Sequence, residues 1–261
     1  PEGCLINGII TNEAELTAAL QGFFAANELP TQRVALAAGG SQFNHRVLTL
    51  PRMSEKKRAA VLTREFSTGG ADVTAPLDDY MLLSTDKKTK ADTVLATRVE
   101  SAVIETYINL AAACGLKLYS IDLALAGQIK LVRATPELAG KSFVVLQFDG
   151  DSLIAGLYEK GQYKYSTRSR LFNPRGTEAS GAEIGQKLSG LIQFQTAAKS
   201  EHPIKAVYFG GSTAADLAAC MPACRALQLE VAAYPDTPNV KLPEGVRLAD
   251  IALAAGNLIG R

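Results

Sequence analysis

Hydrophobic and polar positions follow two periods along this chain, one typical of helices and one typical of strands. Apolar residues three and four positions apart predict helices over 12–27, 54–66, 99–114, 122–132, 180–198, 214–227 and 249–259. Alternating or continuous apolar runs predict strands over 34–38, 43–50, 79–84, 93–97, 116–121, 143–148, 153–158, 162–168, 206–209 and 229–232. The mixture indicates an α/β protein.

The order of these elements also predicts local pairing and a compact unit. Residues 39–41 read Gly-Gly-Ser, a sequence typical of a tight turn. We therefore expect strands 34–38 and 43–50 to form an antiparallel hairpin. The segment 34–122 alternates as β-β-α-β-β-α-β, which predicts a unit of its own. Residues 136–141 place a proline, a glycine and charges between apolar runs, and they predict a linker.

Composition and charge exclude several classes of protein. With 27 Lys and Arg against 26 Asp and Glu, the net charge is +1, which gives no broad attraction to nucleic acid or to an anionic membrane. A hydrophobic content of 47% is that of a globular chain. Since no apolar stretch approaches the roughly 20 residues of a transmembrane span, we expect no direct membrane insertion. The sequence begins at Pro1 without a methionine or a signal-peptide pattern, so we expect an upstream segment.

One acidic turn is a candidate for phosphate or metal chemistry. The run Asp149-Gly150-Asp151-Ser152 follows a buried strand, and a carboxylate such as Asp149 at a strand end can hold a metal-bound water near a phosphate. Asp-Gly is also an ordinary hairpin turn. From the spacing alone, the plain turn is the favoured interpretation.

A glycine pair between a strand and a helix is the second candidate. Gly210, Gly211 and Ser212 follow the apolar run 206–209 and precede a predicted helix. Glycines there let a ligand approach the backbone, and a helix N-terminus offers free N–H groups. The same pattern is common at any strand-to-helix turn. The sequence lacks the phosphate-loop lysine motif, the Gly-x-Ser-x-Gly motif and His-Glu-x-x-His.

Taken in order, four segments resemble a known family. The run Val207-Tyr208-Phe209-Gly210-Gly211-Ser212, with Leu217 and the strand Leu229-Glu230-Val231 after it, is similar to an adenosine motif. Gly8-Ile9-Ile10 before helix 12–27 is similar to the lead into a first helix. Residues 34–51, with Arg64-Glu65-Phe66, and residues 115–122 are similar to the start and the end of an inserted subdomain 1C. The chain thereby resembles the PilM-type branch of the FtsA/PilM group of actin-like ATPases.

The resemblance implies a two-lobed, actin-like (ribonuclease H-like) α/β fold with an inserted subdomain. Residues 1–33 and 123–135 would form the remainder of lobe 1, which is 1A-like. Residues 34–122 would form the 1C-like insertion. Residues 142–261 would form lobe 2, 2A/2B-like, with 249–259 as its closing helix.

The resemblance also implies a role and partners. PilM-type proteins assemble type IV pili, and relatives serve type II secretion. Such a protein is cytoplasmic and peripheral at the inner membrane through a partner. It binds the cytoplasmic tail of a PilN-like inner-membrane protein, contacts other pilus platform proteins and binds no nucleic acid. Candidates for the tail groove are Phe43, Arg46 and Leu48, which are equally ordinary sheet residues.

Many members of the family bind ATP with magnesium between the two lobes. The resemblance places Gln147 where the second phosphate motif has an Asp, and Asp149 where it has a Gly. If the register is shifted so that Asp149 takes the place of the motif's Asp, then Asp151 takes the place of its Gly. The Asp151 side chain would there crowd and repel a phosphate. Glu183 and Lys187 resemble nucleotide-facing positions, and an i, i+4 surface pair is an equal alternative. The first phosphate loop belongs on a hairpin before Pro1.

These departures favour a scaffold with weak or absent ATP hydrolysis. ATP and magnesium are candidate ligands, bound through Gln147, Asp149, Gly150, Ser152 and the glycine pair, with Asp149 the one weak candidate for the metal. A first alternative is an active ATPase whose phosphate hairpin lies upstream. A second is an FtsA-like division tether, which we disfavour because no amphipathic helix precedes Arg261.

Overall fold

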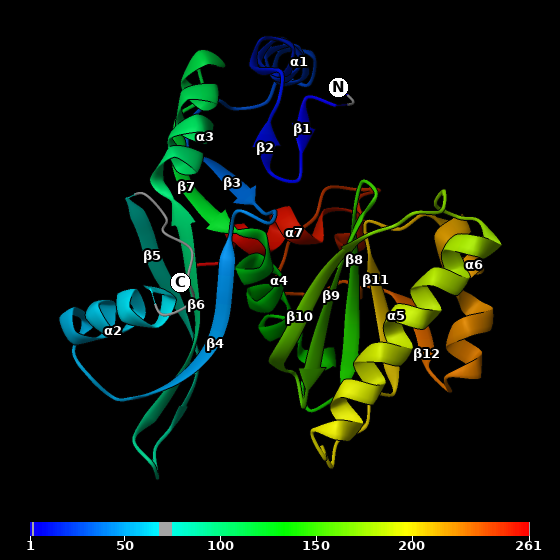
Figure 1. Cartoon of the computed structure of the whole chain (residues 1–261). Coiled ribbons are helices and arrows are strands. Elements are labelled where there is room, and N and C mark those ends of the chain that lie inside the picture. The colour runs from blue at the N-terminus through cyan, green and yellow to red at the C-terminus, as the bar shows by residue number, and fades with distance from the viewer. Residues whose placement is uncertain (2, 68–74, 261) are drawn as a thin grey trace. The chain divides into compact units, whose positions relative to one another are not determined.

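The computed structural model describes residues 1, 3–67 and 75–260, and its helices follow the predicted ones closely (Figure 1). The helices are α1 Glu13–Ala26, α2 Glu55–Ser67, α3 Ser101–Ala113, α4 Ala124–Arg133, α5 Glu178–Ala197, α6 Ala214–Ala226 and α7 Leu248–Leu258. The strands are β1 Leu5–Ile6, β2 Ile9–Ile10, β3 Val34–Ala38, β4 Asn44–Pro51, β5 Pro76–Asp86, β6 Ala91–Glu100, β7 Leu118–Leu123, β8 Phe143–Asp149, β9 Ser152–Glu159, β10 Gln162–Arg170, β11 Ala206–Gly210 and β12 Glu230–Ala233.

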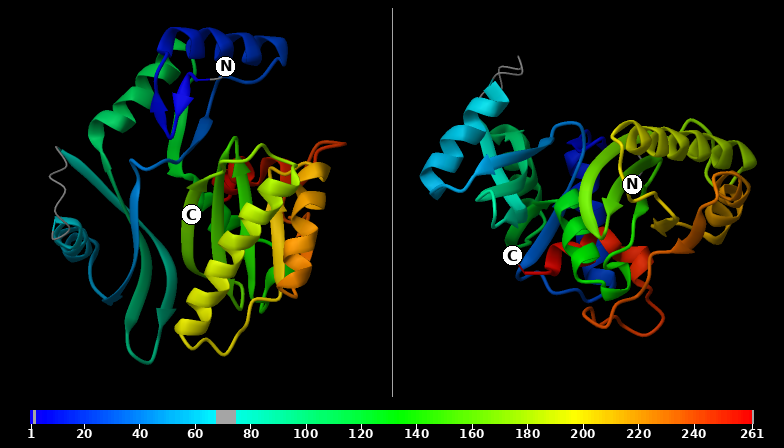
Figure 2. Two further views of the ribbon diagram at one scale, coloured as in Figure 1. Left: turned by 45° about the vertical axis from the view of Figure 1, so that its right-hand side comes forward. Right: turned by 90° about the horizontal axis from the view of Figure 1, so that it is seen from below.

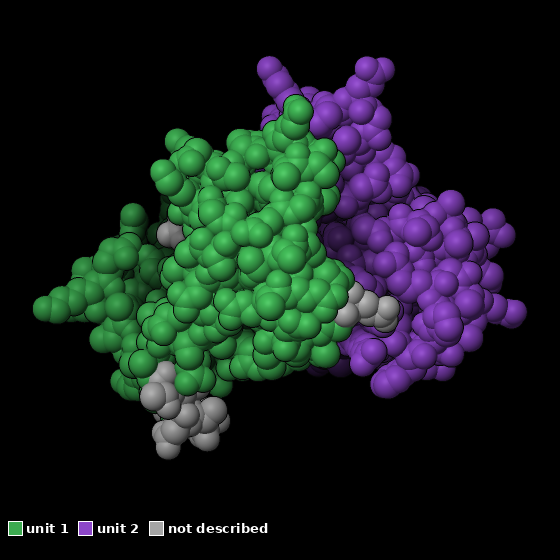
Figure 3. All heavy atoms as spheres, turned by 90° about the horizontal axis from the view of Figure 1, so that it is seen from above, with its two compact units in different colours: residues 1–126 green, residues 127–261 purple. Residues whose placement is uncertain are grey.

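The chain forms two compact units, which Figure 3 shows in different colours. Unit 1 spans Pro1–Ala126 and unit 2 spans Gly127–Arg261. The finer division into 1A-like, 1C-like and lobe 2 segments stays a prediction. Among the residues that the structure describes, no helix has both the length and the apolar character of a membrane span.

Unit 2 is built on one five-stranded sheet in the order β10-β9-β8-β11-β12. Strands β8, β9 and β10 pair antiparallel through tight turns, whereas β8, β11 and β12 run parallel. Val207 of β11 lies between Val144 of β8 and Val231 of β12. Because both faces of this sheet are covered, β8 and β11 are buried along nearly their whole length and do not alternate.

Helices cover both faces of the sheet in unit 2 (Figures 1 and 2). On one face, Val144 and Phe209 of the sheet form a core with Leu188 of α5 and Cys224 of α6. On the other face, the Phe143 and Tyr158 rings stack with centroids 5.1 Å apart. The Tyr158 hydroxyl donates to Gln128 of α4 at 3.1 Å. This layered arrangement fixes the strand ends on which the candidate site is built.

Unit 1 contains a three-stranded antiparallel sheet in the order β4-β6-β5, packed on α2. Leu62 and Phe66 of α2 pack against Val94 and other apolar residues of that sheet. Within the same interface, Arg58 of α2 forms a buried ion pair with Asp92 of β6 at 2.6 Å. A separate parallel pair, β3 and β7, lies in the same unit with α1 and α3.

The predicted hairpin between the third and fourth strands is wrong. Strand β3 pairs in parallel with β7, and β4 pairs antiparallel with β6. The glycines between them serve another contact. A Cβ on Gly40 would lie 2.2 Å from the carbonyl oxygen of Asn7, and one on Gly8 would lie 2.3 Å from that of Gly39. Gly8 and Gly40 therefore let the loop after β3 approach the β1–β2 turn. This loop is not a hairpin turn.

The predicted linker over 136–141 is partly ordered. It begins with a single 3-10 turn, η1 Pro136–Leu138, and the Leu138 side chain is completely buried. The turn is therefore anchored in the interior of unit 2 and does not run free over the surface.

Candidate functional site

The two carboxylates of the acidic turn between β8 and β9 are paired with arginines of β10. Asp149 and Ser152 are paired in the ladder, and Gly150 adopts φ +56°. The carboxylate of Asp149 lies 3.6 Å from the Arg168 guanidinium, which also donates to the Ser152 hydroxyl at 3.2 Å. Asp151 lies 3.7 Å from Arg170. Because each carboxylate has an arginine partner from β10, the turn is close to neutral and not strongly acidic.

Gln147 packs against the glycine pair that follows β11. Gln147 and Gly210 are register partners on neighbouring strands. A Cβ on Gly210 would lie 2.1 Å from Gln147 Oε1, and one on Gly211 would lie 2.6 Å from the Phe148 carbonyl oxygen. Gly211 also adopts φ +62°, a conformation that favours glycine. The internal contact between β8 and β11 thus accounts for both glycines without a ligand.

The amide of Gln147 is buried, and one end of it lacks a partner. The side chain is 4% exposed, and its Nε2 donates to the Phe148 carbonyl at 3.1 Å. Its Oε1 has no hydrogen-bond partner among the described residues. A neutral amide at this strand end cannot supply the negative charge that a carboxylate would give to a metal ion.

Arg175 is a residue that the sequence analysis missed. From the loop before α5, its Nη2 donates to Asp216 Oδ2 at 2.6 Å and to the Gly211 carbonyl at 2.8 Å. Its guanidinium carbon lies 4.3 Å from the centroid of the Phe148 ring. Arg175 thus joins the two turns on which the sequence places a nucleotide.

Asp216 occupies the N-terminus of α6, the second place where a ligand was expected. Its carboxylate accepts hydrogen bonds from the Thr213 backbone N–H at 2.8 Å and from the Thr213 hydroxyl at 2.9 Å. Burial alone would raise the pKa of Asp216, but hydrogen bonds from Arg175 and Thr213 outweigh it, and the pKa lies below its usual value. The capping pattern Thr-x-x-Asp could have revealed this role. Ser212, beside it, is largely buried.

Glu183 and Lys187 of α5 support a loop. Their charged groups lie 3.5 Å apart. Glu183 accepts from the backbone N–H of Phe172 at 3.1 Å, and from the N–H and side-chain amide of Asn173. Burial would raise the pKa of Glu183, but the hydrogen bonds from Asn173 and Phe172 lower it. Glu183 therefore braces the segment before Arg175, and a role of either residue toward nucleotide stays a prediction.

The three residues predicted for a tail groove lie in different environments of unit 1. Phe43 is buried in a core cluster with Tyr107 of α3. Leu48 packs on the core between α2 and the β4-β6-β5 sheet. Arg46 is exposed, donates to the Glu65 carbonyl at 2.9 Å and lies over the Phe66 ring. Arg46 and Leu48 thus both pack toward Phe66 of α2, whereas Phe43 lies in a separate core cluster, and a tail groove at these three residues stays a prediction.

The fit of magnesium to the unit 2 residues is poor. Magnesium takes oxygen ligands, commonly one or two carboxylates together with phosphate and water. Asp149 already faces Arg168, and Gln147 is neutral. Among the described residues, no group of three or more His, Cys, Asp and Glu side chains is arranged to hold a metal ion. Asp149 as a magnesium ligand stays a prediction.

Comparison with solved structures assigns the architecture. A chain of a PilM–PilN type IV pilus biogenesis complex is similar to this one with a TM-score of 0.78 and 16% identity, covering 98% of this chain and 87% of that one. The fold is that of the actin-like ATPases. A Bacteroides thetaiotaomicron protein with an actin-like ATPase fold and unknown function is similar at a TM-score of 0.54 and 13% identity, over 94% of this chain and 81% of that chain.

The predicted fold class, and the likeness to PilM-type proteins in fold, are therefore confirmed. No protein-family model matches the chain, and no curated protein matches its sequence. The actin-like fold alone does not assign a partner or a reaction to this chain.

Proposed function

We propose that this actin-like chain is a scaffold of a type IV pilus, or related secretion, assembly platform. In this role it is cytoplasmic and peripheral at the inner membrane, where it binds the cytoplasmic tail of a PilN-like partner and contacts other platform proteins. The observation that supports the proposal is the likeness, over 98% of the chain, to a chain of a PilM–PilN complex.

We further propose that the chain hydrolyses ATP weakly or not at all. Phosphoryl transfer depends on placing a metal ion and a nucleophile against the terminal phosphate. In unit 2, the positions that would do this carry a neutral Gln147, an Asp149 paired with Arg168, and a helix N-terminus closed by Asp216. These contacts support weak or absent turnover.

The partner proposal is tested by titrating the chain with a synthetic peptide of the cytoplasmic tail of the PilN-type protein from the same organism. Calorimetry should show saturable binding with one peptide per chain, and a scrambled peptide of equal composition should not bind. Equal binding of both peptides, or none of either, contradicts the proposal. Variants at Arg46 and at an exposed control, Arg64, would show whether the predicted groove takes part.

The nucleotide proposal is tested separately. A ligand that binds only the native state raises the melting temperature, and at 100 times its Kd it adds about 2.7 kcal/mol to the unfolding free energy. We expect magnesium–ATP to give no phosphate release above the blank, and an increase in melting temperature without phosphate release would show binding without turnover.

The main alternative is an active ATPase, which the actin-like fold itself favours. Magnesium-dependent ATP hydrolysis that is lost on Gly210→Ala or Asp149→Asn would establish the active ATPase. It would overturn the proposal that the chain hydrolyses ATP weakly or not at all. An FtsA-like tether is a further alternative, and binding to lipid vesicles without any partner would support it.

A further inference from the structure

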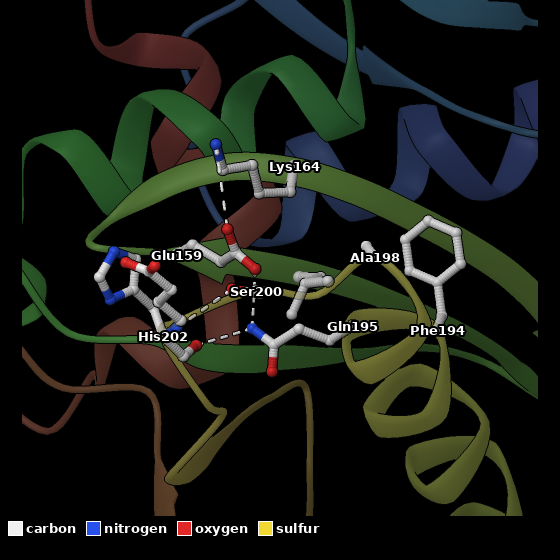
Figure 4. Close-up of a pocket in the computed structure, with 9 residues that line it drawn as sticks. Glu159, Lys164, Phe194, Gln195, Ala198, Ser200 and His202 are labelled. Atoms are coloured by element: carbon white, nitrogen blue, oxygen red, sulfur yellow. Dashed lines mark hydrogen bonds and ion pairs between the residues drawn. The ribbon is translucent and has the colours of Figure 1, made fainter.

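A hollow of about 410 Å³ lies on unit 2, away from the two turns described above (Figure 4). It forms where α5 ends beside β9 and β10. Its wall includes Glu159 of β9, Lys164 of β10, Phe194 and Gln195 of α5, and Glu201 and His202 of the following loop. Volumes of this size suit a small molecule or one long side chain.

The carboxylate at the centre of this hollow is held in place by a buried amide. Gln195 is 5% exposed and donates through Nε2 to Glu159 Oε1 at 2.8 Å and to the His202 carbonyl at 2.8 Å. Its own Oε1 accepts from the Ile204 N–H at 3.0 Å. These three hydrogen bonds fix the orientation of the Gln195 amide. The Glu159 carboxylate is therefore already ordered at the hollow, and a ligand need not immobilise it (Figure 4).

Glu159 is ionised at neutral pH. Burial would raise its pKa, but hydrogen bonds from Ser200 and Gln195 and the nearby charges of Lys164 and His202 outweigh this, and the pKa is lowered. A second carboxylate, Glu201, lines the same hollow.

The end of α5 adds to the negative potential. A helix C-terminus carries about half a negative charge, and α5 is 20 residues long with no basic residue in its last turn. The basic residues Lys164 and His202 of the hollow, and Lys199, which follows the C-cap residue Ala198, oppose this potential. The Lys164 ammonium is 4.0 Å from Glu159 Oε2, and its side chain is 48% exposed, so this ion pair is loose and contributes little.

An aromatic side chain lines the same hollow as the carboxylates. Phe194 is 49% exposed, and its ring stacks on Tyr165 with centroids 4.9 Å apart. An aromatic ring attracts an organic cation and covers its alkyl part. A fixed carboxylate beside an apolar aromatic wall matches a cation that has a hydrocarbon stem.

We propose that this hollow, the Glu159 pocket, binds an alkylammonium or guanidinium group with Glu159 as its counter-ion and Phe194 as the contact for its stem. Lys164 is the internal competitor that the incoming cation displaces. The ligand is either the side chain of a lysine or arginine in a partner peptide or a free organic cation such as a polyamine. The pocket is independent of the proposed tail binding and of nucleotide.

Titration followed by backbone NMR tests the pocket. The probes are the N-acetyl methylamides of lysine, arginine and norleucine, together with spermidine and a Gly-Lys-Gly peptide. We expect a saturable shift of amides over 194–202 with a Kd of about 1 mM for the cationic probes. Norleucine, which has the stem without the charge, should bind about tenfold more weakly.

Two variants with opposite effects make the test selective. Glu159→Gln should weaken the lysine probe about tenfold, because the charged partner is lost. Lys164→Gln should strengthen it, because the competitor is removed. Glu244→Gln, an exposed carboxylate elsewhere in unit 2, should change nothing. Lys164 is half exposed, so its variant reports on binding even if Glu159→Gln reduces stability.

Equal binding of norleucine and lysine would overturn the proposal. Weaker binding of the lysine probe by Lys164→Gln would also overturn it, since Lys164 would then support the probe and not compete with it. Saturable binding of Gly-Lys-Gly without spermidine identifies a peptide ligand. Binding of spermidine identifies a free cation, and both results support the pocket.

Discussion

Arg175 donates to the buried carboxylate of Asp216 at 2.6 Å across two segments that are 41 positions apart. The same guanidinium reaches the carbonyls of Gly211 at 2.8 Å and Gly150 at 3.4 Å. One side chain therefore ties the β8–β9 turn, the β11–α6 turn and the start of α6 together. These are the places where the sequence predicts a nucleotide.

Removal of Arg175 should destabilise the fold. Arg175→Ala leaves Asp216, whose side chain is 2% exposed, as a buried charge without its partner. We expect a loss of about 3 kcal/mol in the unfolding free energy, the size typical of breaking a buried ion pair. Urea denaturation measures it. Arg170→Ala is the matched control, since its pair with Asp151 is largely exposed and should contribute less than about 0.5 kcal/mol. Equal losses for the two variants would contradict the assignment.

Asp216 should make stability depend on pH in the acid range. Its pKa in the folded state lies below the unfolded value of about 3.9. A lowered pKa stabilises the fold above the unfolded pKa, and this contribution is lost as the pH falls through the folded pKa. The stability advantage of the parent over Asp216→Asn should therefore be constant above about pH 5 and shrink below about pH 4. Asp78, whose pKa Arg98 also lowers, is present in both proteins and cancels. A constant difference down to strongly acid pH would count against this.

The glycine pair should respond to a double-mutant cycle. A Cβ at position 210 would meet the end of the Gln147 side chain, whereas a Cβ at position 211 would meet both the Phe148 carbonyl oxygen and the Gln147 amide nitrogen, at positive φ. We expect each to cost about 1–3 kcal/mol, with Gly211→Ala the larger. Gln147→Ala should rescue the first largely and the second only in part, because the Phe148 carbonyl oxygen remains in place, as measured by chemical denaturation. If Gln147→Ala fails to rescue Gly210→Ala, the close packing of this pair does not explain the glycine.

Glu183 should control the order of the loop before Arg175. Glu183→Ala removes the acceptor of the Phe172 and Asn173 N–H groups, so amide hydrogen exchange at these two residues should rise about tenfold or more. Lys187→Ala leaves those bonds in place and should have a small effect. Unchanged exchange in Glu183→Ala would show that the loop is ordered by other contacts.

Most helices and strands were predictable because apolar residues recur along the chain at the spacing of each buried face. Continuous apolar runs such as 143–148 and 206–209 marked strands covered on both faces. The failure at 34–50 also has a physical cause. The partner of β3 is β7, about 80 positions away, and a parallel partner leaves no turn sequence between two strands. The glycines at 39 and 40 looked like a turn because close backbone contact and tight turning require the same residue.

The candidate site was predictable only where its contacts are local. The cap at Asp216 is local, because Thr213 and Asp216 are three positions apart, whereas Gln147 and Gly210 meet only through the pairing of two distant strands. Arg175 lies on a loop with no periodicity, and its partners come from three other segments. The position of Glu183 was predicted, but its role depends on how the loop at Phe172 folds back. Neither relationship has a spacing that a single sequence can show.

The contact between Gly8 and Gly40 has a consequence for how distant relatives are recognised. Each glycine stands where the backbone beside the other would strike a side chain, so a change at one position alone is penalised. Chains that keep this contact should carry both glycines, and chains that lose one should lose the other or alter the loop length between them. Two glycines linked in this way, 32 positions apart, therefore define this backbone contact more strictly than either glycine alone.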